Sequence, residues 1–341
     1  MQAMVLNRYN HDLVLAEVAL PGPGPLDVIL KVSNCGICGT DLKIISGKLA
    51  HITKLPHIPG HEISGEIVEV GSRVKNVKVG QQGIVYFYLA CGNCELCKNG
   101  RENICYSVKR LGFELNGGYS QFVKFPAHNF CAVNRKLSFS EMAVLPDAVA
   151  APYHALKTLA SLKAGQTLLI VGLGGLGIHA VQIANLFDCR IAVADIRGEA
   201  VQLAGTFGAD LLINSNKEDP FERVMDWTHG EGVDIVLEGV GVKQTFSWSL
   251  KSLKRGGKLV LMGYDPVDML PLSAIDMHYN EWSIVGSRLA TRGELIEVID
   301  YFEQGEIQPV IAKTIPLHKA NSALAEVKEG KNSGRIVLDV D

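Results

Sequence analysis

The hydrophobic and polar positions follow two patterns along the chain, and the change falls near Ala150. Before it, short alternating or β-branched runs such as Val28–Val32 and Glu66–Val70 predict strands of a half-buried sheet. Glycine and proline separate these runs, and Pro21-Gly22-Pro23-Gly24-Pro25 predicts a turn. The first part of the chain is therefore expected to be rich in β-structure.

Beyond Ala150, apolar runs without alternation are separated by stretches with a helical pattern. Leu168–Val171 is typical of a parallel strand buried on both faces, and a helix is predicted from about Gly175 to Phe187. Further strands are predicted at Arg190–Ala194, Asp210–Ile213, Asp234–Leu237, Lys258–Met262 and Ser283–Val285. This repeated alternation predicts a doubly wound parallel sheet, and hence an α/β fold. A helix near Gly293–Gln304 and a final strand at Arg335–Val340 follow.

The composition narrows the classes of protein. The length of 341 residues is enough for two domains, and 47% hydrophobic with 20% charged residues suits a packed core. A net charge of -3 without a long basic run argues against nucleic-acid or anionic-membrane partners. No apolar run approaches the roughly 20 residues of a membrane span. The start Met1–Met4 lacks the pattern of a secretory leader, so a cytoplasmic location is expected.

Four of the eight cysteines are closely spaced. In a reducing compartment cysteines are better interpreted as metal ligands or buried apolar residues than as disulfides. Cys91, Cys94, Cys97 and Cys105 have the spacing C-x2-C-x2-C-x7-C, which can close a tetrahedral zinc shell. A closed shell is structural and carries no catalysis. An iron–sulfur cluster also uses four thiolates, and the spacing alone does not decide between the two.

A glycine-rich segment follows the first strand of the predicted parallel sheet. Gly172-Leu173-Gly174-Gly175-Leu176-Gly177 fits G-x-G-x-x-G and opens a helix. Gly172 permits the tight turn, Gly174 lets the backbone approach a pyrophosphate, and Gly177 lets helix and strand pack closely. The helix N-terminus, at Gly175 and Leu176, then faces the phosphates.

An acidic residue ends the next predicted strand, at the distance that this fingerprint requires. Asp195 can accept hydrogen bonds from a ribose 2′-hydroxyl and repel a 2′-phosphate, which favours NAD over NADP. Arg197 could hold such a phosphate, although a solvated arginine in the first helical turn is the simpler interpretation.

Three dispersed segments suggest a second metal site. They are Cys35–Asp41, Gly60–Gly65 and Pro146–Ala148. Taken separately, the first contains a possible CxxC redox pair, the second an ordinary buried histidine, and the third a helix cap.

Together with the cysteine cluster and the glycine-rich segment, these motifs resemble those of zinc-containing medium-chain alcohol dehydrogenases. The resemblance covers nearly the whole chain, with the motifs in the family's order and at its approximate spacing. It implies a GroES-like β-rich catalytic domain at 1–150 and 288–341, with a zinc lobe at about 86–110. A Rossmann NAD-binding domain at 151–287 is inserted between these parts, with the active site in the cleft between the domains.

The resemblance also implies the ligands of a catalytic zinc. Cys38, His61 and Asp147 would bind it, Asp147 standing where other members have Cys or Glu. Glu62 would be a carboxylate that can exchange onto the metal, and Asp41 would orient the ligand histidine.

Two further residues are implied near the reacting groups. Thr40 stands where the family has a hydroxyl that relays the substrate's proton. Lys43 replaces the histidine of many members, so it could complete the relay with a lowered pKa, or contact cofactor phosphate or substrate instead. Phe87 resembles the aromatic wall of the substrate pocket.

The implied function is reversible hydride transfer from a primary or secondary alcohol, including a polyol or sugar alcohol, to NAD. Each subunit would hold two zinc ions. The alternatives are a zinc-free quinone or enoyl reductase of the same fold and a non-catalytic NAD-sensing interaction protein. Trp282–Arg288 resembles the family's edge strand that pairs across a dimer, so a homotetramer or homodimer is expected.

Overall fold

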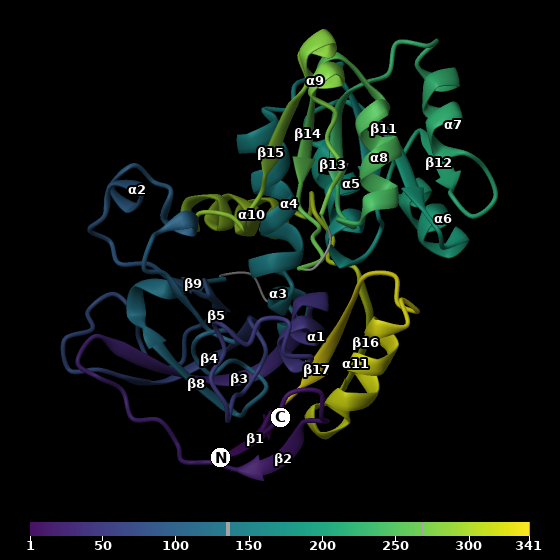
Figure 1. The fold of residues 1–341 in the computed structure, drawn as a ribbon. Coiled ribbons are helices and arrows are strands. Elements are labelled where there is room, and N and C mark those ends of the chain that lie inside the picture. The colour runs from purple at the N-terminus through teal and green to yellow at the C-terminus, as the bar shows by residue number, and fades with distance from the viewer. Residues whose placement is uncertain (134–136, 267–268, 341) are drawn as a thin grey trace. The chain divides into compact units, whose positions relative to one another are not determined.

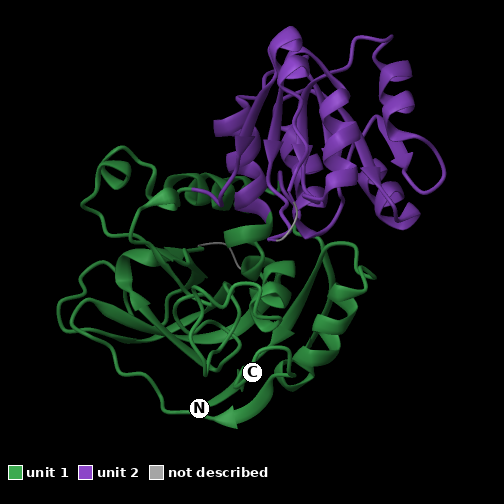
Figure 2. Cartoon of the chain, viewed as in Figure 1, with its two compact units in different colours: residues 1–148, 291–305, 309–341 green, residues 149–290, 306–308 purple. Residues whose placement is uncertain are grey.

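The computed structural model describes residues 1–133, 137–266 and 269–340, and its elements follow one another as in Figure 1. The chain forms two compact units (Figure 2). Unit 1 comprises Met1–Ala148, Thr291–Gly305 and Pro309–Asp341, and unit 2 comprises Val149–Ala290 and Glu306–Gln308. Among the described residues, none of the helices combines the length and apolar character that crossing a membrane requires.

Unit 1 is built on a mostly antiparallel sheet. Its strand order is β16-β17-β3-β4-β5-β9, with β8 also paired to β3. These strands are β3 (Asp27–Ile37), β4 (Glu62–Val70), β5 (Gln82–Val85), β8 (Phe122–Pro126), β9 (Phe130–Ala132), β16 (Ile311–Pro316) and β17 (Arg335–Asp339). Two small sheets pair β1 (Gln2–Val5) with β2 (Val14–Glu17) and β6 (Tyr88–Leu89) with β7 (Lys109–Arg110).

The helices of unit 1 are short, apart from α10 and α11. They are α1 (Gly39–Ile45), α2 (Glu95–Lys98), η1 (Glu102–Ile104), η2 (Ala127–Asn129), α3 (Phe139–Ala143), α10 (Arg292–Gln304), η5 (Leu317–Lys319) and α11 (Ala320–Lys328). A π-helical turn, η3 (Leu145–Val149), ends at the boundary with unit 2.

Two strands of unit 1 are longer than the sequence pattern predicts. The predicted strand Val28–Val32 is the first half of β3, which continues through the polar and small residues Ser33, Asn34 and Gly36. This second half pairs with β4 on one side and β17 on the other, so backbone hydrogen bonds hold it without an apolar run. Likewise β4 begins at Glu62, four residues before the prediction.

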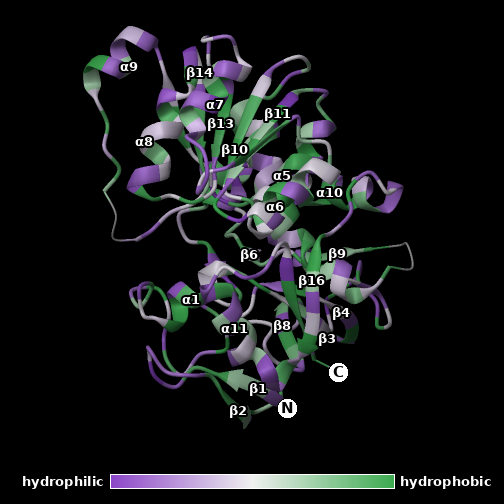
Figure 3. Cartoon of the chain, turned by 90° about the vertical axis from the view of Figure 1, so that its right-hand side faces the viewer, coloured by the Kyte–Doolittle hydropathy of each residue, from purple (hydrophilic) through white to green (hydrophobic). Residues whose placement is uncertain are grey.

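Unit 2 contains a parallel sheet of six strands in the order β12-β11-β10-β13-β14-β15, which confirms the doubly wound prediction. The strands are β10 (Thr167–Val171), β11 (Arg190–Asp195), β12 (Leu211–Asn214), β13 (Val233–Glu238), β14 (Leu253–Leu261) and β15 (Ser283–Gly286). The helices are α4 (Ala150–Tyr153), η4 (His154–Ala160), α5 (Gly175–Asn185), α6 (Gly198–Thr206), α7 (Pro220–Trp227), α8 (Lys243–Lys251) and α9 (Ala274–Asn280). Figure 3 shows the apolar character of the central strands, whose side chains form the core of this unit.

The chain order of these strands places the glycine-rich segment at a favourable point. From β10 the chain runs to β11 and β12 on one side of the sheet, and then returns to β13 on the other side of β10. The strand order therefore reverses next to β10. In sheets of this kind, ligands bind at the carboxyl ends of the strands where the order reverses.

Candidate functional site

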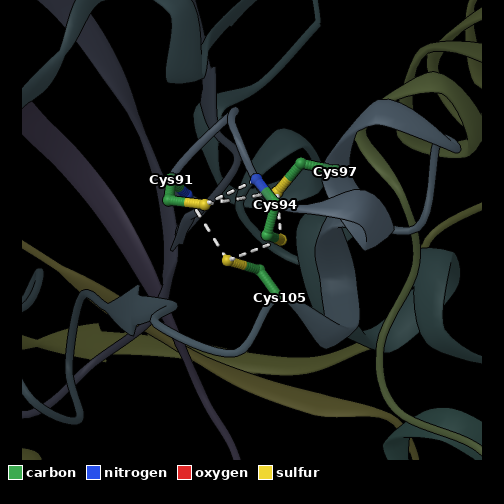
Figure 4. Close-up of side chains that lie close together, drawn as sticks. All are labelled: Cys91, Cys94, Cys97 and Cys105. Atoms are coloured by element: carbon green, nitrogen blue, oxygen red, sulfur yellow. Dashed lines mark hydrogen bonds between the residues drawn. The ribbon is translucent and has the colours of Figure 1, made fainter.

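Four cysteine sulfurs converge in a lobe of unit 1, as Figure 4 shows. The Sγ atoms of Cys94 and Cys97 lie 3.5 Å apart, and the Cys91–Cys97 and Cys94–Cys105 pairs are each separated by 3.9 Å. A Zn–S bond of about 2.3 Å places the sulfurs of a tetrahedral shell about 3.8 Å apart. The donor set therefore fits one zinc ion. An iron–sulfur cluster fits poorly, because its several iron atoms would hold the thiolates further apart.

The lobe reaches this arrangement through local backbone geometry. Gly92 and Gly100 have φ of 71° and 68°, in the left-handed region that favours glycine, so the chain can wrap closely around the sulfurs. The backbone N–H groups of Asn93 and Cys94 both donate to the Cys91 sulfur at 3.4 Å. These bonds lower the pKa of Cys91 to about 6, which favours the thiolate that a metal binds.

The three dispersed segments meet inside unit 1. Cys38 follows β3 and precedes α1, His61 precedes β4, and Asp147 lies in η3. The Cys38 Sγ lies 3.3 Å from the Asp147 Oδ2, and the His61 Nε2 lies 3.5 Å from the same oxygen. The potential ligand atoms of all three residues fall within 4.8 Å of one another. One thiolate, one imidazole and one carboxylate form the three-ligand set that a catalytic zinc takes.

The electrostatics of this cluster suit a cation. Although burial opposes protonation, contacts with Asp147, Asp41 and Cys38 raise the pKa of His61 well above its ordinary value. Burial opposes ionisation of Asp147 too, yet His61 and Arg335 hold the pKa of that carboxyl well below its usual range. The surroundings therefore favour positive charge beside Asp147.

A buried arginine that the sequence interpretation missed joins this cluster. Arg335, the first residue of β17, places its Nη2 2.9 Å from Asp147 Oδ2, 2.8 Å from Glu62 Oε1 and 3.5 Å from Cys38 Sγ. Glu62, the first residue of β4, points one oxygen at this guanidinium, while its Oε2 has no hydrogen-bond partner among the described residues. In the sequence, Arg335 stands directly before the apolar run of β17, and this was a usable signal of a buried charge. A buried arginine requires acidic partners.

Asp41 lies behind the histidine and is completely buried. Its Oδ1 is 3.6 Å from His61 Nδ1, and its Oδ2 accepts hydrogen bonds from the Cys38 backbone N–H at 2.9 Å and the Tyr119 hydroxyl at 3.0 Å. The carboxylate thus contacts two of the three candidate ligand residues. Because it faces the Nδ1 of His61, the Nε2 of the same ring points toward Asp147.

Aromatic side chains cover His61. The ring centroids of Phe87 and Phe113 lie 4.8 and 5.0 Å from that of His61, and the two phenyl rings are nearly parallel. The Arg110 guanidinium stacks over Phe113 at 4.1 Å and is paired with Glu114. Phe113 and Arg110 carried no signal in the sequence, whereas Phe87 was expected from the resemblance.

The two residues expected to move protons lie on α1. Thr40 is half-buried, with its hydroxyl 3.7 Å from the Cys38 sulfur, and Lys43 is half-buried in the last helical turn. Thr40 thus lies beside one ligand atom of the cluster.

In unit 2, the glycine-rich segment has the backbone that the fingerprint requires. Gly172 has φ of 87°, and a Cβ on Gly177 would clash with the Gly172 carbonyl oxygen. A Cβ on Gly174 would meet nothing within 4 Å, which leaves its backbone open to a ligand at the start of α5, where Gly175 and Leu176 form the first turn.

Asp195 ends β11 and is tied to this segment. Its Oδ2 accepts a hydrogen bond from the Leu173 N–H at 2.7 Å. Arg197 pairs with it, the Arg197 Nε and Nη2 lying 3.0 Å from Oδ1 and Oδ2 respectively. Despite burial, these contacts lower the pKa of Asp195, which keeps the carboxylate ionised.

Known protein families match both parts of the chain. Residues 24–135 match the alcohol dehydrogenase GroES-like domain, and residues 175–304 match the zinc-binding dehydrogenase family. An alcohol dehydrogenase of Geobacillus stearothermophilus is 36% identical over 339 residues, which cover 99% of this chain and 98% of that protein. An NAD-dependent alcohol dehydrogenase of Sulfolobus acidocaldarius is 33% identical, with both chains covered completely.

A solved structure gives the same result. The crystal structure of the alcohol dehydrogenase from the archaeon Aeropyrum pernix superimposes with a TM-score of 0.94 at 30% identity, covering 100% of both chains. Similarity in sequence and fold thus extends over the whole length. The chain belongs to the zinc-type medium-chain alcohol dehydrogenase family.

Proposed function

We propose that Cys38, His61 and Asp147 would hold the catalytic zinc ion of this zinc-dependent, NAD-linked alcohol dehydrogenase. The observation that carries the proposal is the convergence of one sulfur, one imidazole and one carboxylate inside unit 1, from three distant parts of the chain. When bound, zinc supplies a Lewis acid that lowers the pKa of an alcohol, and NAD supplies the hydride acceptor.

The surrounding residues prepare the ligands. Asp41 orients His61, so that its Nε2 is the free ligand atom. Arg335 neutralises part of the negative charge of Asp147 and Glu62, which would otherwise be costly to bury together. The ion pair with Arg335 holds Glu62 beside the cluster, where its carboxylate can exchange onto the metal.

Thr40 begins the proton relay, because its hydroxyl lies beside the Cys38 sulfur and can both donate and accept a hydrogen bond. Lys43, one helical turn further along α1, continues the relay or contacts the cofactor or substrate. Replacing Lys43 by Met distinguishes these roles: a changed pH profile of kcat supports the relay, and a raised KM supports the contact.

Unit 2 holds NAD through Gly172, Gly174, Gly175, Leu176 and Gly177 at the end of β10. Asp195 accepts hydrogen bonds from the ribose hydroxyls of NAD, and its negative charge disfavours a 2′-phosphate. Arg197 is engaged with Asp195, so its guanidinium serves the carboxylate rather than a phosphate.

The substrate is a primary or secondary alcohol. The phenyl rings of Phe87 and Phe113 beside His61 support a substituent with apolar surface, and a polyol or sugar alcohol is the other class to test. A panel of both classes, followed by NADH absorbance with NAD and NADP, tests the proposal. Turnover of several alcohols with NAD is expected, and failure with the whole panel would support a non-catalytic role. The two sets of potential metal ligands speak against the zinc-free reductase branch.

The assembly and location are also proposals. β15 is an edge strand of the described sheet, and the segment that precedes it in the chain has exposed apolar residues, which supports a homodimer or homotetramer; these residues are Met269, Leu272, Ile275 and Tyr279. Light scattering after size exclusion should then give a mass of at least two 36.9 kDa chains. The eight cysteines are free, which supports a reducing cytoplasmic location.

A further inference from the structure

Tyr119 is a completely buried side chain on the segment that links β7 to β8. Its hydroxyl donates a hydrogen bond of 3.0 Å to the Asp41 Oδ2. A buried tyrosine hydroxyl requires a partner, and here the partner is a carboxylate that is itself 0% exposed. The pair therefore acts as a fixed contact inside unit 1 and not as a surface interaction.

Asp41 transmits this contact to two of the proposed zinc ligands. Its Oδ2 also accepts the backbone N–H of Cys38, and its Oδ1 faces the His61 Nδ1 at 3.6 Å. Two donors on one oxygen fix the rotation of the carboxyl group. Of these two, the Tyr119 hydroxyl is the side-chain donor, so its removal leaves the carboxylate with one anchor on that oxygen.

The backbone around Tyr119 fixes where its hydroxyl lies. The Tyr119 N–H donates to the Pro59 carbonyl at 3.0 Å, and the Gly118 N–H donates to the Gly60 carbonyl at 2.8 Å. The tyrosine ring covers Gly60 so closely that a Cβ at this glycine would clash with it. Tyr119 therefore packs against the residue that immediately precedes His61.

From these contacts we propose that Tyr119 is a positioning residue for the metal centre, acting through Asp41 on His61 and Cys38. The inference rests on the proposed function, because it assumes that these residues bind zinc. Residues that orient metal ligands typically change metal affinity 10- to 100-fold when they are lost. Tyr119→Phe keeps the ring that covers Gly60 and removes the hydroxyl, and it should weaken zinc binding at this site by about tenfold.

The test measures the metal directly, on the full chain, by titration with zinc against a chromogenic chelator. The four-cysteine lobe provides an internal reference, because the hydrogen bonds of Tyr119 join it to Met4, Asp41 and Pro59 and, among the described residues, to none of the lobe's cysteines. In Tyr119→Phe, one of two zinc ions should bind about tenfold more weakly while the other is unchanged. Substitution with Co²⁺ identifies the weakened site, since a one-thiolate and a four-thiolate site differ in charge-transfer absorbance.

Tyr9→Phe is the matched control. The Tyr9 hydroxyl donates to the Thr53 carbonyl at 2.5 Å within the same unit, so this variant also loses a tyrosine hydrogen bond, but none at Asp41. It should bind both zinc ions like the wild type. Excess zinc should restore part of kcat in Tyr119→Phe, and the dissociation constant for NADH should stay the same.

Two results would overturn the inference, and they have different meanings. If Tyr119→Phe lowers the unfolding midpoint but binds both zinc ions with wild-type affinity, Tyr119 has a packing role only. If the wild-type chain binds a single zinc ion, in the cysteine lobe, the proposed catalytic centre itself is wrong and the inference about Tyr119 fails with it.

Discussion

The two metal-binding clusters of unit 1 are built on opposite principles. The cysteine lobe takes its four ligands from residues 91–105, and α2 within it contributes no buried side chain. The buried centre joins Cys38 to Asp147 across 109 positions and to Arg335 across 297. In the lobe, backbone amides donate to the Cys91 sulfur, whereas in the buried centre charged side chains balance one another.

This difference teaches what each metal does. The lobe has little apolar burial of its own, so a bound ion must supply much of its folding free energy. Of the proposed ligands of the buried centre, Cys38 follows β3 and His61 precedes β4, and these strands pair along most of their length and hold both residues in place, while Asp147 lies in η3. The lobe is therefore expected to depend on zinc for structure, and the buried centre to use zinc for chemistry.

The largest expected effect is on turnover, at the buried centre. His61→Ala removes a proposed ligand, and the loss of a Lewis acid worth several kcal/mol should lower kcat by at least about 10³-fold. Binding of NADH, measured by fluorescence, should remain near that of the wild type, because the glycine-rich segment lies in unit 2. Near-wild-type turnover in this variant would contradict the assignment of His61 as a zinc ligand.

The charge balance of the buried centre can be tested next. Arg335→Met leaves Glu62 and Asp147 without their guanidinium, and breaking a buried ion pair from one side costs about 3–5 kcal/mol. Chemical denaturation should show this loss as a lower midpoint. Lys331→Met is the control, because its pair with Glu329 is exposed and should leave the midpoint unchanged. Equal midpoints for the two variants would mean that Arg335 is not needed for charge balance.

For the cysteine lobe, the larger effect is expected on stability and the smaller effect on turnover. Cys97→Ser should release the lobe's zinc and reduce stability by at least about 2 kcal/mol, or roughly 4–8 °C in the thermal midpoint. At a temperature where the variant remains folded, kcat should stay within about threefold of the wild type, because a closed shell offers no position for substrate. A loss of turnover as large as that of His61→Ala would end the distinction between the two sites.

The smallest effect is expected in unit 2. Its cofactor-binding residues are recognised from spacing along the chain, as the ligands of the cysteine lobe are. Asp195→Ala removes a charged acceptor of ribose hydroxyls and frees Arg197 for a 2′-phosphate. Charge-assisted hydrogen bonds contribute about 1.5–3 kcal/mol, so the ratio of kcat/KM for NADP to that for NAD should rise roughly 10- to 100-fold. An unchanged ratio would show that Asp195 serves only the Leu173 amide.

The same contrast explains how much could be predicted from the sequence. The cysteine lobe, the glycine-rich segment and Asp195 depend on spacing along the chain, and their geometry agrees with the pattern. The ligands of the buried centre were ambiguous one by one and needed the family resemblance.

Phe113 and Tyr119 could not be found in this way, because their roles arise from tertiary contacts. Arg335 was visible only as a charged residue at the start of an apolar strand, and its acidic partners Glu62 and Asp147 come from distant parts of the chain. The buried charges also disguised the strands themselves. β4 begins with Glu62, which pairs with Arg335, and a charged residue does not extend an apolar pattern. The second half of β3 lacks an apolar run for a different reason, because backbone pairing with β4 and β17 holds it on both sides.

Crystallographic anomalous scattering at the zinc absorption edge tests the central claim most directly. The account predicts two zinc peaks per chain, one among Cys91, Cys94, Cys97 and Cys105, and one bonded to Cys38, His61 and Asp147. In His61→Ala the second peak should weaken strongly while the first remains. A wild-type crystal with zinc in the cysteine lobe and none beside His61 would contradict the account.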